Sequence, residues 1–105
     1  MAFAVMNTVS VTAETLPSAL ADVQRLELDH YEDQPGFRRV SVFVSEDQTS
    51  VVTLAEWDSR DDFMAFRQTE IGRQAVETAL PWHPHIAFFE VVASLHTVKP
   101  GKRLA

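Results

Sequence analysis

Hydrophobic residues alternate with polar residues in some stretches of the chain and recur every three or four positions in others. Alternation, together with many Val, Thr and Phe residues, predicts β-strands over 2–12, 37–45, 51–57 and 86–97. The polar segment 46–50 is typical of a turn, so the second and third strands should form a hairpin. Strands therefore begin and end the predicted domain, and a hairpin lies near its middle.

A helical period fills the two intervals that separate these strands. Apolar residues share one helix face over 16–31, and Pro35 follows the expected end of that helix. A second helical region begins at Ser59, whose following residues fit a capping box. A further short helix begins near Thr69. Two prolines within 81–85 exclude regular helix from the segment before the last strand.

The predicted element order is β-α-β-β-α-β, with the second helix in two pieces. This is the split βαβ pattern of ferredoxin-like domains, so we expect an α+β fold with a four-stranded antiparallel sheet. The last strand carries apolar residues on both faces, with Phe88 on one and Phe89 on the other. Because one helical layer covers only one face, we expect a homodimer in which two sheets pack together. The domain should span 1–97, followed by a flexible tail over 98–105.

Composition restricts the classes of function. The chain has 105 residues, the size of one domain, and no cysteine, which excludes disulfides, thiolate metal sites and thiol nucleophiles. A formal net charge of −6 disfavours nucleic acids and anionic membranes as partners. The sequence contains neither a membrane-spanning apolar run nor a signal-peptide pattern, so we expect a cytoplasmic protein.

Four segments, taken in order, resemble one protein family. They are Met6-Asn-Thr-Val-Ser-Val on the first strand, Gln34-Pro-Gly-Phe before the second, 51–63, and Phe89-Glu-Val-Val on the last. The stretch 51–63 runs from a strand through a tryptophan and a short acidic and serine linker to a helix with an aromatic residue. On these segments the chain resembles the antibiotic biosynthesis monooxygenase family of dimeric α+β barrels over about 4–93.

The resemblance implies a pocket between sheet and helices, and a chemistry without metal, flavin or haem. Some members use O₂ to oxidise phenols, anthrones or quinols to quinones, because the deprotonated substrate supplies the electrons. The resemblance makes Asn7 and Trp57 the catalytic residues, which orient a substrate oxygen and position the substrate. Thr53 and Phe63 depart from the Asn and Tyr of some quinone-forming members, which removes a proton donor. A purely structural role in the core stays open for Asn7 and Trp57.

The pattern itself adds further candidate substrate-binding residues. Phe63 and Phe66 lie three positions apart on one helix and share an apolar face, which is either core or pocket wall. Glu27 and His30 form an i,i+3 pair on the sheet-facing side of the first helix. A carboxylate beside an imidazole suits a general base, unless both side chains simply reach water.

His83 and His85 flank Pro84 in the loop before the last strand. This rigid segment places imidazole either at a pocket mouth or on the surface. Two histidines without a third ligand do not make a metal site, so no metal is predicted. His30, His83 and His85 are the candidates for removing a proton from the substrate.

We therefore expect a cofactor-independent monooxygenase that acts on a small aromatic substrate, of the polyketide type, with O₂. A non-catalytic ligand-binding or accessory protein of the same fold is the alternative that Thr53 and Phe63 favour. A cyclase or isomerase also remains open, because the same pocket would stabilise an enolate without O₂. Haem degradation is a distant alternative, since Phe66 and Val76 occupy the tryptophan and axial histidine positions of the haem-degrading members.

Overall fold

The computed structural model describes residues 1–95 as a two-layer α+β fold with a four-stranded sheet in the order β2-β3-β1-β4. Its elements are β1 (Phe3–Ser10), α1 (Leu16–Val23), η1 (Gln24–Leu28), β2 (Phe37–Val44), β3 (Ser50–Trp57), α2 (Arg60–Arg67), α3 (Glu70–Ala79), η2 (Leu80–Trp82) and β4 (His85–Glu90). All strand pairs are antiparallel. The ferredoxin-like order predicted from the sequence is confirmed.

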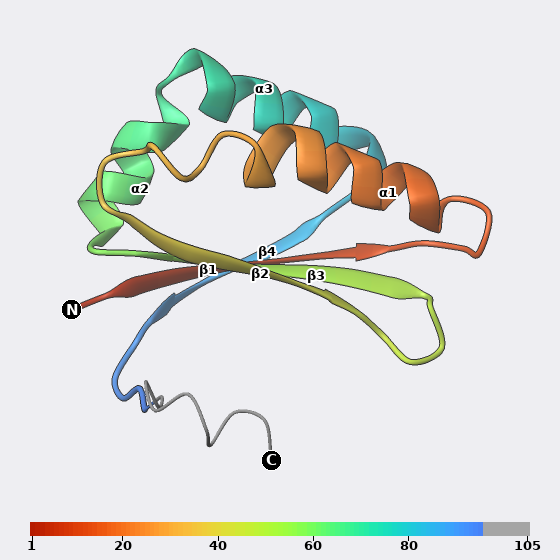
Figure 1. The fold of residues 1–105 in the computed structure, drawn as a ribbon, viewed down its shortest axis with the longest axis horizontal. Coiled ribbons are helices and arrows are strands. Elements are labelled where there is room, and N and C mark those ends of the chain that lie inside the picture. Colours follow the sequence, from red (N-terminus) through yellow and green to blue (C-terminus); the bar gives the residue numbers. More distant parts are fainter. Residues whose placement is uncertain (96–105) are drawn as a thin grey trace, which may run out of the picture.

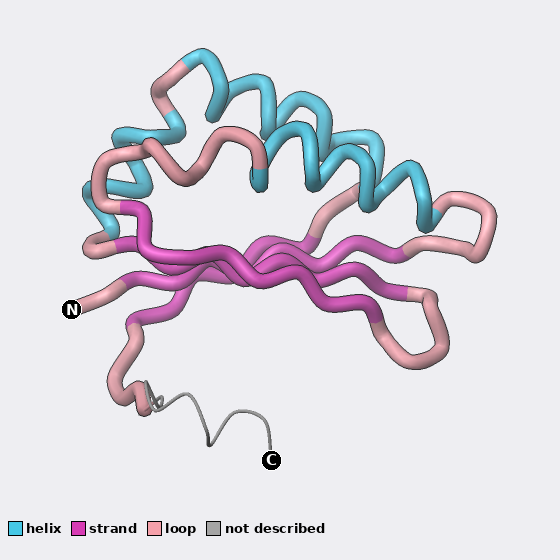
Figure 2. Tube along the Cα trace, in the orientation of Figure 1, coloured by secondary structure: helices cyan, strands magenta, loops and turns pink. Residues whose placement is uncertain are grey.

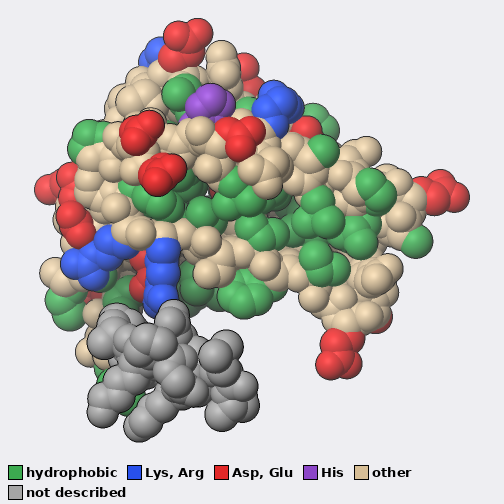
Figure 3. Space-filling view, in the orientation of Figure 1, with side chains coloured by type: hydrophobic (Ala, Val, Ile, Leu, Met, Phe, Trp, Pro, Cys, Tyr) green, Lys and Arg blue, Asp and Glu red, His purple; other side chains and the backbone are tan. Residues whose placement is uncertain are grey.

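The helices form one layer over one face of the sheet (Figure 1), and the opposite face carries no helix (Figure 2). On the face seen in Figure 3, hydrophobic side chains gather along the band between the helices and the sheet. Strand β1 lies between β3 and β4, and its register places Asn7 opposite Thr53 on one side and Ile86 on the other. Residues from three strands are thereby brought together beneath the helices.

Two clusters of buried side chains make the core. The larger one surrounds Trp57, which is fully buried, and its ring lies 5.8 Å from that of Tyr31, 5.5 Å from Phe37 and 5.2 Å from Phe66 between centroids. The smaller cluster, at the other end of the sheet, consists of Val11, Ala19 and Val51. Aromatic packing therefore joins the helices to the sheet mainly at one end of the molecule.

Three of the predicted elements are longer than the observed ones by more than one residue, and the first of them, the strand expected over 2–12, spans Phe3–Ser10. The helix expected over 16–31 is α-helical only to Val23 and continues as a π-helix, in which the Asp29 N–H donates to the Gln24 carbonyl at 3.0 Å. The strand expected over 86–97 ends at Glu90, because β1 is its only neighbour and begins at Phe3, opposite that residue. Residues 96–97 of that prediction, and the predicted tail 98–105, lie outside the described residues.

Both helix starts in the second half of the chain are capped, at Ser59 as the sequence predicted and also at Thr69. The Ser59 hydroxyl accepts from the Asp62 N–H at 3.1 Å and donates to its carboxylate at 2.9 Å. The Thr69 hydroxyl accepts from the Gly72 N–H at 3.1 Å. These bonds satisfy donors that the first helical turn leaves free. Within residues 1–95 no helix is long and apolar enough to cross a membrane.

Gly72 allows α3 to approach the end of α2 closely. A Cβ atom at this position would overlap the backbone carbonyl oxygen of Phe66. Helix propensity alone favours alanine over glycine by about 1 kcal/mol. The cost of this overlap should exceed the gain in helix propensity. We therefore expect Gly72→Ala to lower the free energy of unfolding by about 1–3 kcal/mol, as measured by urea denaturation. Gln74→Ala, exposed on the same helix, is the control and should change it by less than about 0.5 kcal/mol. A Gly72→Ala variant as stable as the wild type would contradict the close approach.

Candidate active site

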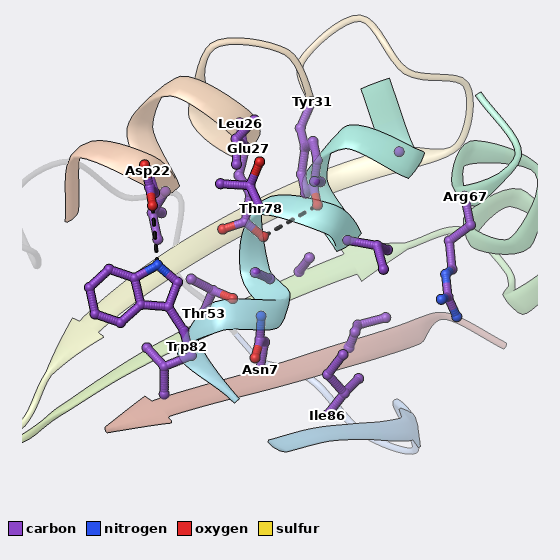
Figure 4. A pocket seen from close by; sticks show the side chains of 18 of the residues that line it. Asn7, Asp22, Leu26, Glu27, Tyr31, Thr53, Arg67, Thr78, Trp82 and Ile86 are labelled. Carbon is purple, nitrogen blue, oxygen red and sulfur yellow. Dashed lines mark hydrogen bonds between the residues drawn. The ribbon is translucent and has the colours of Figure 1, made fainter. Parts of the chain in front are cut away.

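A cavity of about 130 Å³ lies between the helices and the sheet, in the space that separates the two core clusters. Its helical side is lined by small residues, Ala19, Gly72, Ala75 and Ala79, which leave room above the middle of the sheet. Most of the lining is apolar. The polar side chains that line it are Asn7, Asp22, Glu27, Tyr31, Thr53, Arg67, Thr78 and the Trp82 indole (Figure 4).

Asn7 and Thr53 form the polar part of the floor, because β1 and β3 pair them directly across the sheet. Their side chains rise toward the helical layer in Figure 4. The Asn7 amide oxygen is buried and has no hydrogen-bond partner within the described chain. Buried polar atoms are nearly always paired, so this amide is a group whose partner is absent from the folded chain itself. In Figure 4 the amide nitrogen of Asn7 points toward the helical layer, so this nitrogen is the atom that can donate to an oxygen of a ligand in the cavity.

Glu27 and Tyr31 form the polar part of the roof. The Tyr31 hydroxyl donates to the Glu27 carboxylate at 3.3 Å, and both side chains line the cavity. Burial raises the pKa of Glu27 from 4.5 to about 7, against the opposing effect of the tyrosine hydrogen bond. Burial also raises the pKa of Tyr31 well above 10, as do the charge and hydrogen bond of Glu27. Near neutral pH, Tyr31 is therefore a donor and Glu27 titrates, which suits general base catalysis.

The π-helix positions this carboxylate. Glu27 lies inside the π-helical segment, and the Tyr31 N–H donates to the Glu27 carbonyl at 2.9 Å, so one turn places both side chains on the same side. A π-turn adds a residue relative to an α-turn and so rotates all later side chains around the axis. Such turns recur at functional sites. The local backbone therefore turns a charged residue toward an apolar space.

Two further polar features lie on opposite sides of Glu27 (Figure 4). On one side the Trp82 indole N–H donates to the Asp22 carboxylate at 3.1 Å, which ties η2 to α1. On the other side the guanidinium carbon of Arg67 lies 5.9 Å from the centroid of the Phe63 ring. Asp22 also pairs with Arg25 at 3.2 Å, so its charge is balanced, whereas Arg67 has no carboxylate partner among residues 1–95.

The structure brings together five of the residues singled out from the sequence. Asn7, Glu27, Thr53, Phe63 and Phe66 all line the cavity. Thr53 and both phenylalanines are buried, so their side chains serve core and cavity wall together. The partner of Glu27 is Tyr31, not the His30 that the sequence suggested.

Four other singled-out residues do not line the cavity. Trp57 lies behind Phe63 and Phe66, with no exposed surface, and its indole N–H has no partner within the described chain. His30, His83 and His85 are exposed. No group of three or more metal-ligating side chains occurs among residues 1–95.

Sequence reasoning missed several lining residues, and only some left a local signal. Tyr31 follows Glu27 by four positions, and Arg67 follows Phe63 by four, so helical spacing would have placed each beside its partner. Asp22 and Trp82 are 60 positions apart, and nothing local in the sequence connects them. Ile86 and Phe88 on β4 line the cavity because β4 pairs with β1.

The raised pKa of Glu27 should make stability fall as pH rises. Between about pH 4.5 and 7 the folded state holds a proton that the unfolded chain releases, so the free energy of unfolding decreases by up to about 3 kcal/mol across this window. Glu27→Gln removes that dependence, and it should be more stable than the wild type at about pH 8 and similar below about pH 4.5. Urea denaturation over a pH series measures this. The exposed Glu77→Gln is the control, and identical pH slopes for wild type and Glu27→Gln would refute the prediction.

Comparisons with known proteins place this geometry in a family. Solved structures that share the fold include a Nitrosomonas europaea protein named as a candidate antibiotic biosynthesis monooxygenase, with a TM-score of 0.74 and 16% identity over 87% of this chain and 90% of the other. Another is SnoaB, a cofactor-independent oxygenase from Streptomyces nogalater solved as a mutant, with a TM-score of 0.71 and 18% identity over 90% of this chain and 96% of the other. A conserved Bacteroides thetaiotaomicron protein of unknown function, described as a possible oxidoreductase, has a TM-score of 0.76 and 15% identity over 86% of this chain and 97% of the other.

At such identities, structural likeness establishes the fold alone. No curated protein matches the chain at a significant level. A family model described as antibiotic biosynthesis monooxygenase, however, matches residues 2–78, which is most of the domain. The chain therefore belongs to the antibiotic biosynthesis monooxygenase family.

Proposed function

We propose that this protein is a cofactor-independent monooxygenase that oxidises an electron-rich phenol or anthrone to a quinone with O₂. The observation that carries the proposal is the Asn7 amide, whose nitrogen faces an apolar cavity that the titrating carboxylate of Glu27 also lines. The family includes cofactor-independent oxygenases, SnoaB among the structures that share this fold. The two side chains supply what such a reaction needs, a base and a donor to the resulting oxyanion.

The proposed reaction begins with removal of a proton from the substrate by Glu27. The Asn7 amide donates a hydrogen bond to the oxyanion that forms, in a site where few water molecules compete for it. The electron-rich anion passes an electron to O₂, and the two radicals combine to form a carbon–oxygen bond. The protonated hydroperoxide then loses water to leave a carbonyl. For an anthrone, the balance is one CH₂ group and one O₂ converted to one C=O group and one H₂O.

The remaining site residues act in this proposal by shaping the cavity. Phe63 and Phe66 form its aromatic wall, and Trp57 supports both rings from behind. Thr53 offers a hydroxyl beside Asn7. A cavity of about 130 Å³ encloses about one six-membered ring, since an engineered cavity of about 150 Å³ holds benzene. The reacting ring would therefore be enclosed and the rest of a larger substrate would extend outward.

Oxygen consumption with an anthrone or a naphthol tests the proposal. Glu27→Gln and Asn7→Ala should each lower kcat, the former by about 10²–10⁴-fold, because the base or the oxyanion donor is lost. The wild-type rate should rise with pH around a midpoint of about 7, where Glu27 loses its proton. Tyr31→Phe should move this midpoint upward, because the lost hydrogen bond favours the carboxylate.

The exposed Glu77→Gln is the matched control and should leave rate and midpoint unchanged. If purified protein gives no oxygen uptake above buffer across a panel of phenols, the monooxygenase proposal fails. Exchange of substrate protons with D₂O in the absence of O₂ would then point to the isomerase alternative, and binding without exchange to a ligand-binding protein.

We also propose that two copies pack through the face of the sheet that no helix covers. Phe43 on β2 and Phe89 on β4 point to this face and are 51% and 46% exposed, with Met6 and Leu54 between them. Phe89→Glu should therefore convert a dimer to a monomer, because a charge would be buried in the interface. Light scattering after size-exclusion chromatography measures the mass. Gln74→Glu, exposed on α3, is the control, and a monomeric wild type would overturn the proposal.

A further inference from the structure

We propose that Arg67 binds an anionic group of the substrate, so that the substrate is an aromatic carboxylate whose acid group lies at the cavity mouth. This inference rests on the proposed function for the identity of the reacting ring. Its own basis is the position of the only cationic side chain that lines the cavity within residues 1–95.

The mouth of the cavity lies over β4. Of all the lining residues, only Ile86 and Phe88 are exposed, at 47% and 42%, and the others are buried or half-buried. Both belong to β4, which forms an edge of the sheet. The cavity therefore opens to solvent along this edge of the sheet. Glu27, in η1, and Tyr31, just after η1, lie away from this opening.

Arg67 lies near the cavity mouth, next to the Phe63 ring that contacts Phe88. Its guanidinium carbon lies 5.9 Å from the Phe63 ring centroid, and that ring lies 5.7 Å from the ring of Phe88. The side chain is half-buried and lines the cavity. An arginine held against an aromatic ring keeps its planar set of donors free for an incoming anion.

Arg67 has no counter-charge among residues 1–95, a property it shares with Arg60 and Arg73, but of these three only Arg67 lines the cavity. Arg25, Arg38 and Arg39 each pair with a carboxylate, and Arg67 pairs with none among residues 1–95. A half-buried cation without a counter-charge at a cavity mouth forms a strong, charge-assisted hydrogen bond with an anionic group of a ligand. A carboxylate fits best, because its two oxygens match the paired donors of a guanidinium.

The distribution of charge also sets the orientation of the substrate. Glu27 lines the cavity under the helices and, once ionised, repels an anionic group, whereas Arg67 attracts it at the mouth. A carboxylate at the mouth keeps part of its hydration, which avoids the cost of burying a charge. The opposite end of the ring system, with its hydroxyl, then points toward Asn7 and Glu27.

Calorimetric titration of the full chain under anaerobic conditions tests the inference without any need for turnover. The two probes are 6-hydroxy-2-naphthoate and its neutral isostere 6-hydroxy-2-naphthamide. Wild type should bind the acid at least about tenfold more tightly than the amide, the size expected for a hydrogen-bonded charge pair. Arg67→Gln should remove this preference by weakening the acid alone, and Arg67→Lys should keep part of it.

Arg73→Gln is the matched control, because it removes one positive charge from an exposed position on the neighbouring helix. It should keep the preference for the acid. Any of three results would overturn the inference. They are equal affinity of wild type for the acid and the amide, weaker binding of both probes by Arg67→Gln, and no binding of either probe. The proposed function is judged separately, by oxygen uptake with neutral phenols, so either idea can fail while the other stands.

Discussion

Packing of aromatic rings around Trp57 is the interaction on which the rest of the structure depends. The Trp57 indole has no exposed surface, and it contacts aromatic rings from the segment after η1, from the start of β2 and from helix α2. It therefore packs three separate segments of the chain against the sheet. Large rings fill one end of the interlayer space. Toward the other end the helices present alanines and a glycine, which cannot reach the sheet, and a cavity remains between two core clusters.

The polar groups of this cavity derive their properties from the same packing. Glu27 lies over an apolar space because the π-helical turn directs it there, and desolvation then raises its pKa toward neutrality. Tyr31 belongs both to the aromatic cluster and to the carboxylate's hydrogen bond, so it links the rigid end of the core to the titrating group. Catalytic potential in this domain thus depends on burial more than on any unusual residue.

Prediction from the sequence succeeded where the controlling interactions are local. Alternation along β1 and β3, and the cap at Ser59, involve residues a few positions apart, and the structure has them as expected. It failed at β4, whose end depends on where β1 begins. For the histidines the sequence left both a pocket mouth and the surface open, because a residue type suited to proton transfer says nothing about whether its side chain is exposed.

The sequence by itself determined the order of elements, the cap at Ser59 and the family, because period and capping chemistry are properties of neighbouring residues. Only the tertiary structure decided that Glu27 pairs with Tyr31 and that Trp57 lies behind the cavity wall. It also decided that Arg67 lines the cavity without a carboxylate partner among residues 1–95. These outcomes depend on which side chains from distant segments exclude water from one another, and burial of that kind exists only once the helical layer has closed over the sheet.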